Sequence, residues 1–457
     1  MRILIINGSP AGDESITLQT VHYLEKHFPA HEYTLLNVGR QIRAFEKDFS
    51  AAEEELAAAE LILFCYPVYT FLAPSQLHRF IELIKESGVD LRGKYATQIT
   101  TSKHFYDTTA HRYIADNAAD LQLRYIRGLS ADMEDLLHEE GRRQALDFFR
   151  HTLWMMKHGL EDPTGAAGET ATEEQTEADL YLCSPPEKPH AKKDKARVVI
   201  VADMGEEDRK LQAMVDRFIA ECPYPAELVN LRDFAFQGGC LGCFHCASDG
   251  TCIYKDGFDS FLRERIQDAD ATVYAFRIQD HSMGYRFKLY DDRQFCNGHR
   301  TVTMGKPVGY LVDGKLSAEE NLRVLIEARA EVGGNYLAGI ACDEKAPEEA
   351  IDRLAAELSY AVCNHYQPPA NFYGVGGRKI FRDLIYQMQG LMREDHRFYK
   401  ENGFYDDFPQ KRKGTIAAMY LVGALMKNKK LQKKMKGKMT EGMLMPYQKV
   451  LDKAPEI

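Results

Sequence analysis

Short apolar runs alternate with amphipathic stretches along the first part of this chain of 457 residues. The runs Arg2–Ile6, Tyr33–Val38, Leu61–Cys65, Tyr95–Thr101 and Leu121–Ile126 have the length of buried β-strands. Between them, stretches such as LQTVHYLEKHF place their apolar residues on one face of a helix. Strands that alternate with helices predict a parallel, doubly wound α/β sheet.

The same order of elements begins again at Ala196. AAEEELAAAELILFCYPVY in the first series resembles FLRERIQDADATVYAFRIQ in the second. A period of about 195 residues is too long for a solenoid repeat and fits a duplicated domain. The second series of expected strands is Val198–Ala202, Glu227–Leu231, Thr272–Phe276, Val308–Val312 and Tyr336–Ala341.

This pattern predicts two tandem domains with five-stranded sheets, residues 1–158 and 196–366. Residues 159–195 are rich in Glu, Thr, Ala, Pro and Lys, a composition typical of a linker. Residues 367–457 are expected to form a basic helical extension.

The formal net charge of −10 argues against a general nucleic-acid-binding protein. We expect no signal peptide, because MRILIING lacks a basic start and a long apolar stretch, and no transmembrane span. A cytoplasmic location is the natural expectation. The lysine-rich segment Lys427–Lys438 follows the apolar stretch Ile416–Met426. One reading is that this segment contacts anionic lipid or an acidic partner. The other is that it belongs to an arm that packs on the second domain or on a dimer mate.

The first strand leads directly into Gly8-Ser9-Pro10, followed by Ser15-x-Thr17 and a helix. Backbone N–H groups at a helix N-terminus and Ser or Thr hydroxyls can together bind a phosphate. The segment is neither a Walker A loop nor a GxGxxG fingerprint. On these residues alone, an anion site and an ordinary capped turn both stay open.

Together with CYPVYTFLAPSQLHRFIE after the third strand, this motif resembles the flavodoxin-like NAD(P)H-dependent FMN reductases. The resemblance covers nearly all of residues 1–150 and implies that Ser9, Ser15 and Thr17 hold the FMN phosphate. The residues that it places beside the isoalloxazine ring are Pro67, Val68, Tyr69 and Thr70. Ala11 stands where the family usually has an arginine, which weakens the electrostatics of the phosphate site.

We expect Thr101 and Ser102, at the end of the fourth strand, to approach the same ring, because ligands of open α/β sheets bind beyond the carboxyl ends of the strands. Lys103 is either a cation that stabilises the reduced flavin or a solvated surface lysine. Tyr69, His104 and Tyr106 are candidates for a proton donor near the ring.

The second domain lacks both flavin motifs. Its first strand ends in VVIVADMGEEDRKL, where Asp203, Glu206, Glu207 and Asp208 would repel a phosphate. No Pro-Val-Tyr follows its third strand. We therefore expect that the second domain alone binds no FMN.

The second domain instead contains the run C-x2-C-x2-C-x5-C, formed by Cys240, Cys243, Cys246 and Cys252. In a reducing compartment, clustered thiols more often bind metal or do redox work than form disulfides. The segment resembles the iron–sulfur flavoproteins, a branch of the same superfamily, and this implies that the four cysteines hold a [4Fe-4S] cluster. Zinc and redox-active or inert thiols are the alternatives.

These features predict two tandem flavodoxin-like domains in an FMN- and iron–sulfur-dependent oxidoreductase. It would transfer electrons between a nicotinamide, NAD(P)H, or a reduced protein and a quinone-like, nitro or protein acceptor. The halves would stand in for a dimer of single-domain relatives, and a homodimer of the whole chain is also compatible with the sequence. The alternatives are a non-enzymatic electron carrier, a redox or oxygen sensor, and a plain FMN reductase without a cluster.

Overall fold

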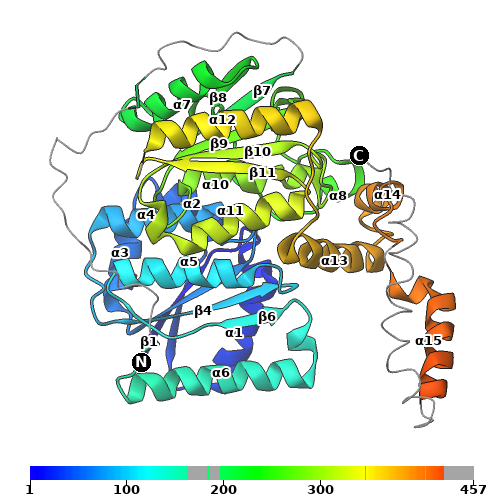
Figure 1. Ribbon diagram of the computed structural model, residues 1–457. Coiled ribbons are helices and arrows are strands. Elements are labelled where there is room, and N and C mark those ends of the chain that lie inside the picture. Colours follow the sequence, from blue (N-terminus) through cyan, green and yellow to red (C-terminus); the bar gives the residue numbers. More distant parts are fainter. Residues whose placement is uncertain (163–182, 185–195, 345, 407, 427–457) are drawn as a thin grey trace. The chain divides into compact units, whose positions relative to one another are not determined.

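A computed structural model describes residues 1–162, 183–184, 196–344, 346–406 and 408–426. These residues form two parallel β-sheets, one in each predicted repeat (Figure 1). The predicted fold class is confirmed, since helices cover both faces of each sheet. The chain divides into two compact units: Met1–His396, which contains both sheets, and Arg397–Ile457.

The first sheet has the strand order β2-β1-β3-β4-β5, and β6 pairs with β4 beyond the end of β5. This order is the flavodoxin-like form of the doubly wound sheet. The strands are β1 (Arg2–Asn7), β2 (Glu32–Leu36), β3 (Leu61–Pro67), β4 (Tyr95–Ser102), β5 (Arg124–Tyr125) and β6 (Leu129–Asp132).

The fifth strand differs most from its expected range, Leu121–Ile126. Gln122 has a φ of 55°, in the left-handed region, so the chain leaves α5 through a turn there. The strand is then interrupted at Gly128, where a Cβ would overlap Gln98 of β4. It continues as β6, so the fifth strand lies later in the sequence than its apolar residues predict.

Helices α1 and α6 pack on one face of this sheet, and α2 to α5 pack on the other. Their ranges are α1 (Ile16–His27), α2 (Val38–Phe45), α3 (Ser50–Ala58), α4 (Ser75–Ser87), α5 (Asp107–Asp120) and α6 (Glu139–Lys157). Within β1, Ile3 and Ile5 belong to the core under α1 and α6, whereas Leu4 and Ile6 belong to the opposite core. Burial on both faces explains why the strand is a continuous apolar run.

The second sheet repeats the same topology, with the order β11-β10-β9-β7-β8. Each of its strands lies within one or two residues of the range expected from the sequence. They are β7 (Val198–Ala202), β8 (Ala226–Asn230), β9 (Ala271–Arg277), β10 (Pro307–Asp313) and β11 (Tyr336–Cys342). The predicted duplication of the sheet is therefore present in the structure.

Helices α7 and α12 cover the outer face of the second sheet, and α10 and α11 cover its inner face. The helices of this half are α7 (Arg209–Glu221), α8 (Cys246–Asp249), α9 (Phe258–Phe261), α10 (Gly284–Arg293), α11 (Glu320–Gly333) and α12 (Pro347–Asn364). A short π-helix, Leu262–Gln267, follows α9.

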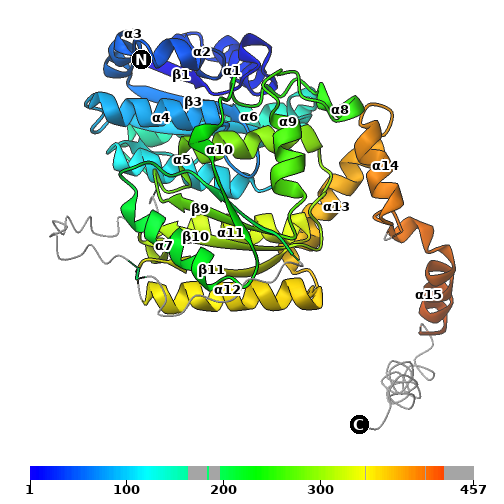
Figure 2. The same cartoon turned by 90° about the horizontal axis from the view of Figure 1, so that it is seen from above.

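The two sheets share one core (Figure 2). α4 packs against α10 and α5 packs against α11. A continuous cluster of buried apolar residues runs from the inner face of the first sheet, through these four helices, to the inner face of the second. The halves are therefore joined by a hydrophobic interior, and not only by the connecting segment.

Part of the predicted extension 367–457 belongs to the first compact unit, because α13 (Phe372–Gln387) packs on α11. α14 (Arg393–Glu401) follows, and in α15 (Lys413–Met426) the side chains of residues 413–424 are exposed. None of the helices in the described ranges has both the length and the apolar character to cross a membrane. Lys427–Lys438 and most of the predicted linker lie outside the described residues.

Candidate functional site

Three loops meet at the carboxyl edge of the first sheet. They follow β1, β3 and β4, which are neighbours in the sheet, and the strand order reverses between β1 and β3. Such a topological switch point is where open α/β sheets bind their ligands.

The loop after β1 is built around a buried asparagine that the sequence reading did not single out. Asn7 Nδ2 donates to the backbone oxygen of Gly12 and to Asn37 Oδ1, both at 2.9 Å, and Asn7 Oδ1 accepts from the backbone N–H of Ser9 at 3.1 Å. Ser15 caps α1, since its hydroxyl accepts from Leu18 N at 3.4 Å. The loop therefore presents the N-terminus of α1 and Ser hydroxyls, which still have an O–H to donate.

Thr17 connects this loop to the fourth strand: its Oγ1 lies 2.6 Å from Thr101 Oγ1, and both side chains are buried. Ala11 stands where the resemblance expects an arginine, but another arginine lies nearby. Arg40, an exposed residue of α2, packs against Gly12, where a Cβ would lie 3.0 Å from Arg40 Cδ. The loop after β1 thus has a cation beside it, on a different element.

The loop after β3 has an unusual backbone. Tyr69 and Leu72 exchange two backbone hydrogen bonds, of 2.8 and 3.0 Å. Between them, Thr70 and Phe71 have φ angles of 41° and 70°. The left-handed region is unfavourable for a β-branched or bulky residue, so contacts from outside the loop must stabilise this conformation.

These loops open onto a cavity of about 580 Å³, within the usual size range of ligand sites. The structure brings all of the predicted flavin residues to its wall: Ser9, Ser15, Thr17, Pro67, Val68, Tyr69, Thr70, Thr101, Ser102 and Lys103. The cysteine run of the second half lines the same cavity, with Cys240, Cys243, Cys246 and Cys252. The residues of the two predicted sites therefore line the same cavity.

Tyr69 brings the cysteine loop into contact with the loop after β3. A Cβ at Gly242 would overlap Tyr69 Oη, and Gly242 has a φ of 62°. Only glycine permits both this backbone conformation and this approach. Two residues earlier in the cysteine loop, the backbone oxygen of Cys240 accepts from Gln76 Nε2 of α4 at 3.3 Å.

The four thiols have different surroundings. Burial raises the pKa of the Cys240 thiol well above its usual value and raises that of Cys246 to about 11. Cys246 donates to the backbone oxygen of Phe295 at 3.0 Å, while Cys243 is exposed. Among the described residues, no group of three or more His, Cys, Asp or Glu side chains is placed to hold a metal ion. The cysteines as arranged do not fit a metal centre.

Lys103 lies on the cavity wall, where its ammonium group contacts two carboxylates. Its Nζ lies 2.8 Å from Asp132 Oδ1 and 3.4 Å from Glu134 Oε1, and 23% of its side chain is exposed. Burial lowers the pKa of Lys103, but the contact with Asp132 outweighs it and the pKa is raised. Its charge on the cavity wall is thus largely balanced.

The proton-donor candidates of this loop are hydrogen-bonded elsewhere and do not line the cavity. His104 Nδ1 lies 2.9 Å from Asp107, and the Tyr106 hydroxyl donates to the backbone oxygen of Tyr373 at 2.9 Å. The lining residues include Phe105 from this loop, but neither His104 nor Tyr106.

The second half and α13 contribute lining residues that the sequence reading missed. They include a fifth thiol, Cys296, whose pKa burial raises to about 12. Arg293 is almost fully buried, pairs with Asp256 at 2.8 Å, and has its Nη2 3.8 Å from Cys252 Sγ. The residues of the region of α13 that line the cavity are Phe381, Leu384, Met388 and Met392. Their apolar spacing on a helix is indistinguishable from that of ordinary packing.

Residues 1–133 match a protein family with a flavodoxin-like fold. The first sheet domain is flavodoxin-like. The second domain lies outside the matched residues, but its sheet has the same strand order as the first. No curated protein matches the chain.

Several solved structures are similar to part of the chain. An FMN-dependent NADH-azoreductase from Bacillus anthracis, in complex with FMN, is 15% identical with a TM-score of 0.28, covering 34% of this chain and 98% of its own. An NAD(P)H:quinone oxidoreductase from Methanothermobacter marburgensis is 11% identical with a TM-score of 0.29, covering 36% and 99%. An NADPH-quinone reductase from P. pentosaceus is 15% identical with a TM-score of 0.28, covering 33% and 97%. Each likeness thus spans about a third of the chain, the length of one flavodoxin-like domain.

Proposed function

We propose that this protein is an FMN-dependent oxidoreductase that transfers electrons between NAD(P)H, or a reduced protein donor, and a quinone-like, nitro or protein acceptor. The observation that carries the proposal is the cavity of about 580 Å³, because every residue that the sequence assigned to FMN lines it.

The residues present fit this cofactor. The hydroxyls of Ser9, Ser15 and Thr17, with the N-terminus of α1, offer donors to a phosphate. The loops after β3 and β4 provide a wall of mixed apolar and hydroxyl character for a flat ring. FMN, when bound, supplies an acceptor for a hydride or two electrons.

The other residues of the cavity act by positioning and by excluding water. Burial raises the pKa of Tyr69 well above its usual value, with contributions from Cys240 and Asp292, so Tyr69 Oη keeps its proton at neutral pH. Phe105, Phe381 and Met388 form an apolar wall, which suits a flat acceptor of low polarity.

The test is an absorption spectrum of the anaerobically purified chain, with identification of any released flavin. Steady-state oxidation of NADH and NADPH is then followed with a quinone or ferricyanide as acceptor. Bound FMN with turnover supports the proposal. FMN without turnover from any donor would leave an electron carrier or redox sensor, and failure to take up FMN would refute the proposal.

A second candidate function adds a [4Fe-4S] cluster. It rests on the C-x2-C-x2-C-x5-C spacing and on the position of all four cysteines at the wall of the proposed flavin cavity. The present arrangement of the thiols does not fit a metal, so the loop from Cys240 to Cys252 would have to rearrange around a cluster. About four iron and four sulfide ions per chain would support this candidate, whereas none would leave a plain FMN reductase.

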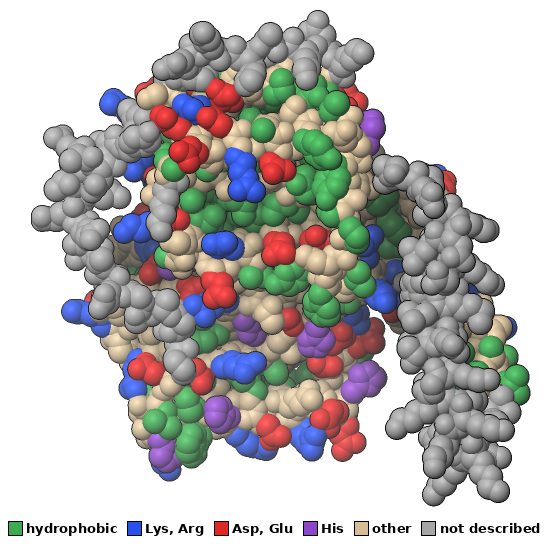
Figure 3. All heavy atoms as spheres, viewed as in Figure 1, with side chains coloured by type: hydrophobic (Ala, Val, Ile, Leu, Met, Phe, Trp, Pro, Cys, Tyr) green, Lys and Arg blue, Asp and Glu red, His purple; other side chains and the backbone are tan. Residues whose placement is uncertain are grey.

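The charge distribution favours small molecules or proteins as partners. Lys and Arg side chains are interspersed with Asp and Glu over the face shown in Figure 3, and the chain has a net charge of −10. A nucleic-acid-binding surface would instead concentrate positive charge. The cytoplasmic location, a homodimer, and a lipid contact through Lys427–Lys438 belong to the proposal as predictions.

A further inference from the structure

A buried ion pair in the second half contacts the loop that we propose to lie beside the flavin. Lys288 and Asp292 stand one turn apart on α10, form an ion pair, and have no exposed side-chain surface. Lys288 Nζ donates to the backbone oxygen of Tyr69 at 3.0 Å and to Thr70 Oγ1 at 2.8 Å. Asp292 accepts from Thr70 Oγ1 at 2.6 Å and from the backbone N–H of Ser75 at 2.8 Å.

These contacts fall on the strained part of the loop. Thr70 is β-branched and has a φ of 41°, a conformation that such residues rarely adopt. Its hydroxyl is held from both sides, since it accepts from Lys288 and donates to Asp292. A buried ion pair is by itself weak evidence of a gain in stability, because desolvation opposes the attraction. Here its hydrogen bonds are directed to the backbone and hydroxyl that shape the cavity wall.

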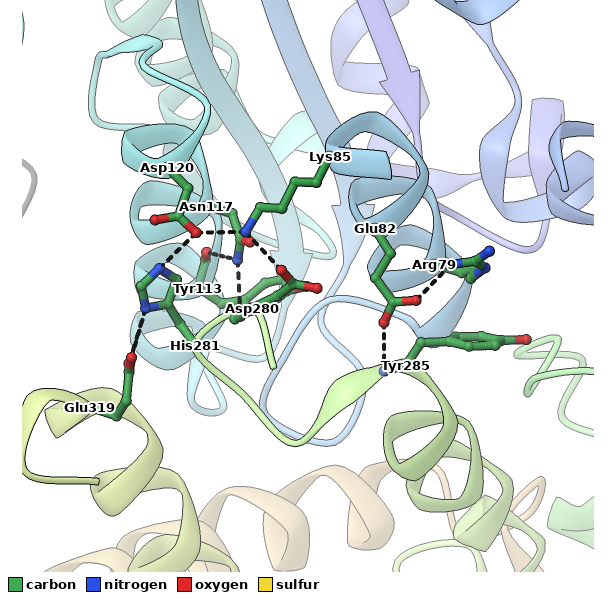
Figure 4. Close-up of polar contacts among 10 residues, drawn as sticks. All are labelled: Arg79, Glu82, Lys85, Tyr113, Asn117, Asp120, Asp280, His281, Tyr285 and Glu319. Carbon is green, nitrogen blue, oxygen red and sulfur yellow. Dashed lines mark hydrogen bonds and ion pairs between the residues drawn. The ribbon is translucent and has the colours of Figure 1, made fainter. Parts of the chain in front are cut away.

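The reverse contact also exists, from the first half to the second (Figure 4). Glu82 of α4 accepts from the backbone N–H of Tyr285 at 2.9 Å, as Asp292 does from Ser75. Lys85 contacts Asp280, in the loop after β9, at 2.8 Å. Each half therefore holds a loop of the other, but the loop that Glu82 and Lys85 hold does not line the cavity.

We propose that Lys288 and Asp292 are positioning residues for FMN. They fix Tyr69 and Thr70 in the conformation that forms the cavity wall, so the half that lacks flavin motifs completes the site of the other half. This inference rests on the proposed function for its ligand, but not for the geometry of the loop.

The test uses the full-length variants Asp292→Asn and Lys288→Met, with Glu82→Gln and Lys85→Met as matched controls. Without FMN, hydrogen exchange of residues 66–73 should be faster by roughly tenfold or more in the first two variants, because a hydrogen bond to a charged group is lost. In the controls, exchange should increase at residues 278–285 instead. The dissociation constant for FMN should rise by roughly tenfold in the first pair and stay within about twofold in the controls.

Unchanged exchange at residues 66–73 in both Asp292→Asn and Lys288→Met would overturn the inference. An equal loss of FMN affinity in the controls would do the same, since it would point to global stability. If Lys288→Met does not fold, the double variant with Asp292→Asn replaces it, because it leaves no unpaired charge in the core. If the wild-type chain takes up no FMN, the proposed function fails, and the exchange result alone decides the inference.

Discussion

The two sheet domains keep the same framework but differ in the loops beyond their strands. Lys94 in the first half and Lys306 in the second each donate to two backbone oxygens directly before the third strand of their own sheet, at 2.7 and 2.8 Å. Gln279 and Ser282 exchange two backbone hydrogen bonds, as Tyr69 and Leu72 do. The loops after the third strand of the two halves thus share a backbone conformation although their sequences differ.

The loop after the first strand shows the opposite outcome. In the first half, the N-terminus of α1 and the hydroxyls around it face the cavity. In the second half, Arg232 contacts Asp203 at 3.0 Å, Glu207 at 2.9 Å and Asp208 at 3.3 Å. Its carboxylates are satisfied by an arginine of the same half, and they would repel a phosphate.

The two pairs of loops differ because packing between the halves restricts one pair and not the other. The loop after the third strand lies between the halves, so each copy is held by the other half and cannot change its backbone freely. The loop after the first strand lies at the sheet edge, where the second copy could lose its hydroxyls without disturbing the core. The second half still contributes to the cavity, since its cysteine loop lines it and Lys288 of α10 contacts Tyr69 and Thr70.

The largest expected effect concerns His281, which occupies the loop position of Phe71 in the other half. Burial lowers its pKa, but Asp120 at 3.1 Å and Glu319 at 3.0 Å outweigh burial and raise the pKa to about 10 (Figure 4). A raised pKa in the folded state stabilises the fold below pH 6.5, and this stabilisation is lost as the pH rises to about 10. His281→Phe should therefore lower the free energy of unfolding at pH 6 by an amount on the order of 4 kcal/mol.

Chemical denaturation of wild type and His281→Phe at several pH values measures this effect. The difference between the two proteins should shrink from pH 6 to pH 10. A difference that does not depend on pH would mean that His281 acts by its shape and not by its charge. Phe71→Leu, a change at the matching position, serves as the control, because it introduces no titrating group.

Much of the fold follows from the sequence because the strands are buried on both faces. Such strands appear as continuous apolar runs, and their position was predicted within a few residues. The fifth strand was the exception, since its interruption at Gly128 depends on contact with Gln98 and not on local pattern. The sequence predicts which residues of the first half line the cavity, because motifs mark them and because parallel strands place their loops at one edge.

The rest of the site depends on contacts between the halves. Nothing near Cys240 in the sequence indicates that its loop rests on Tyr69, a contact that requires Gly242. Lys288 and Asp292 look like an ordinary pair of charges on a helix surface until α10 is packed against α4. A single sequence carries no signal for such pairings.

A charge placed in the phosphate loop should have the next largest effect. Ser15→Asp keeps an oxygen that can cap α1, so the helix should stay intact. It makes the first loop resemble the acidic loop of the second half and sets a negative charge against a phosphate. We expect the FMN dissociation constant to rise roughly 100-fold, a change of about 2.7 kcal/mol. Titration of flavin fluorescence measures it.

Two control variants separate charge from the loss of the hydroxyl. Ser15→Ala removes both the cap and the hydroxyl but adds no charge, so its effect on FMN should be much smaller than that of Ser15→Asp. Asp208→Ser, the reverse change at the N-cap of α7 in the second half, should leave FMN affinity unchanged. If Ser15→Asp binds FMN as the wild type does, the phosphate lies elsewhere in the cavity.

The smallest effect is expected at Lys103, because Asp132 balances its charge. Lys103→Met leaves a carboxylate at the cavity wall and should disfavour the reduced, anionic flavin, lowering its potential by about 15 mV, or threefold for a two-electron couple. Asp132→Asn leaves the lysine unbalanced and should raise the potential by a similar amount. Potentiometric titration of the two variants tests the sign. Shifts of the potential in the same direction in both variants would show that the pair acts on the shape of the loop. Opposite shifts would show that the charge of Lys103 acts on the flavin.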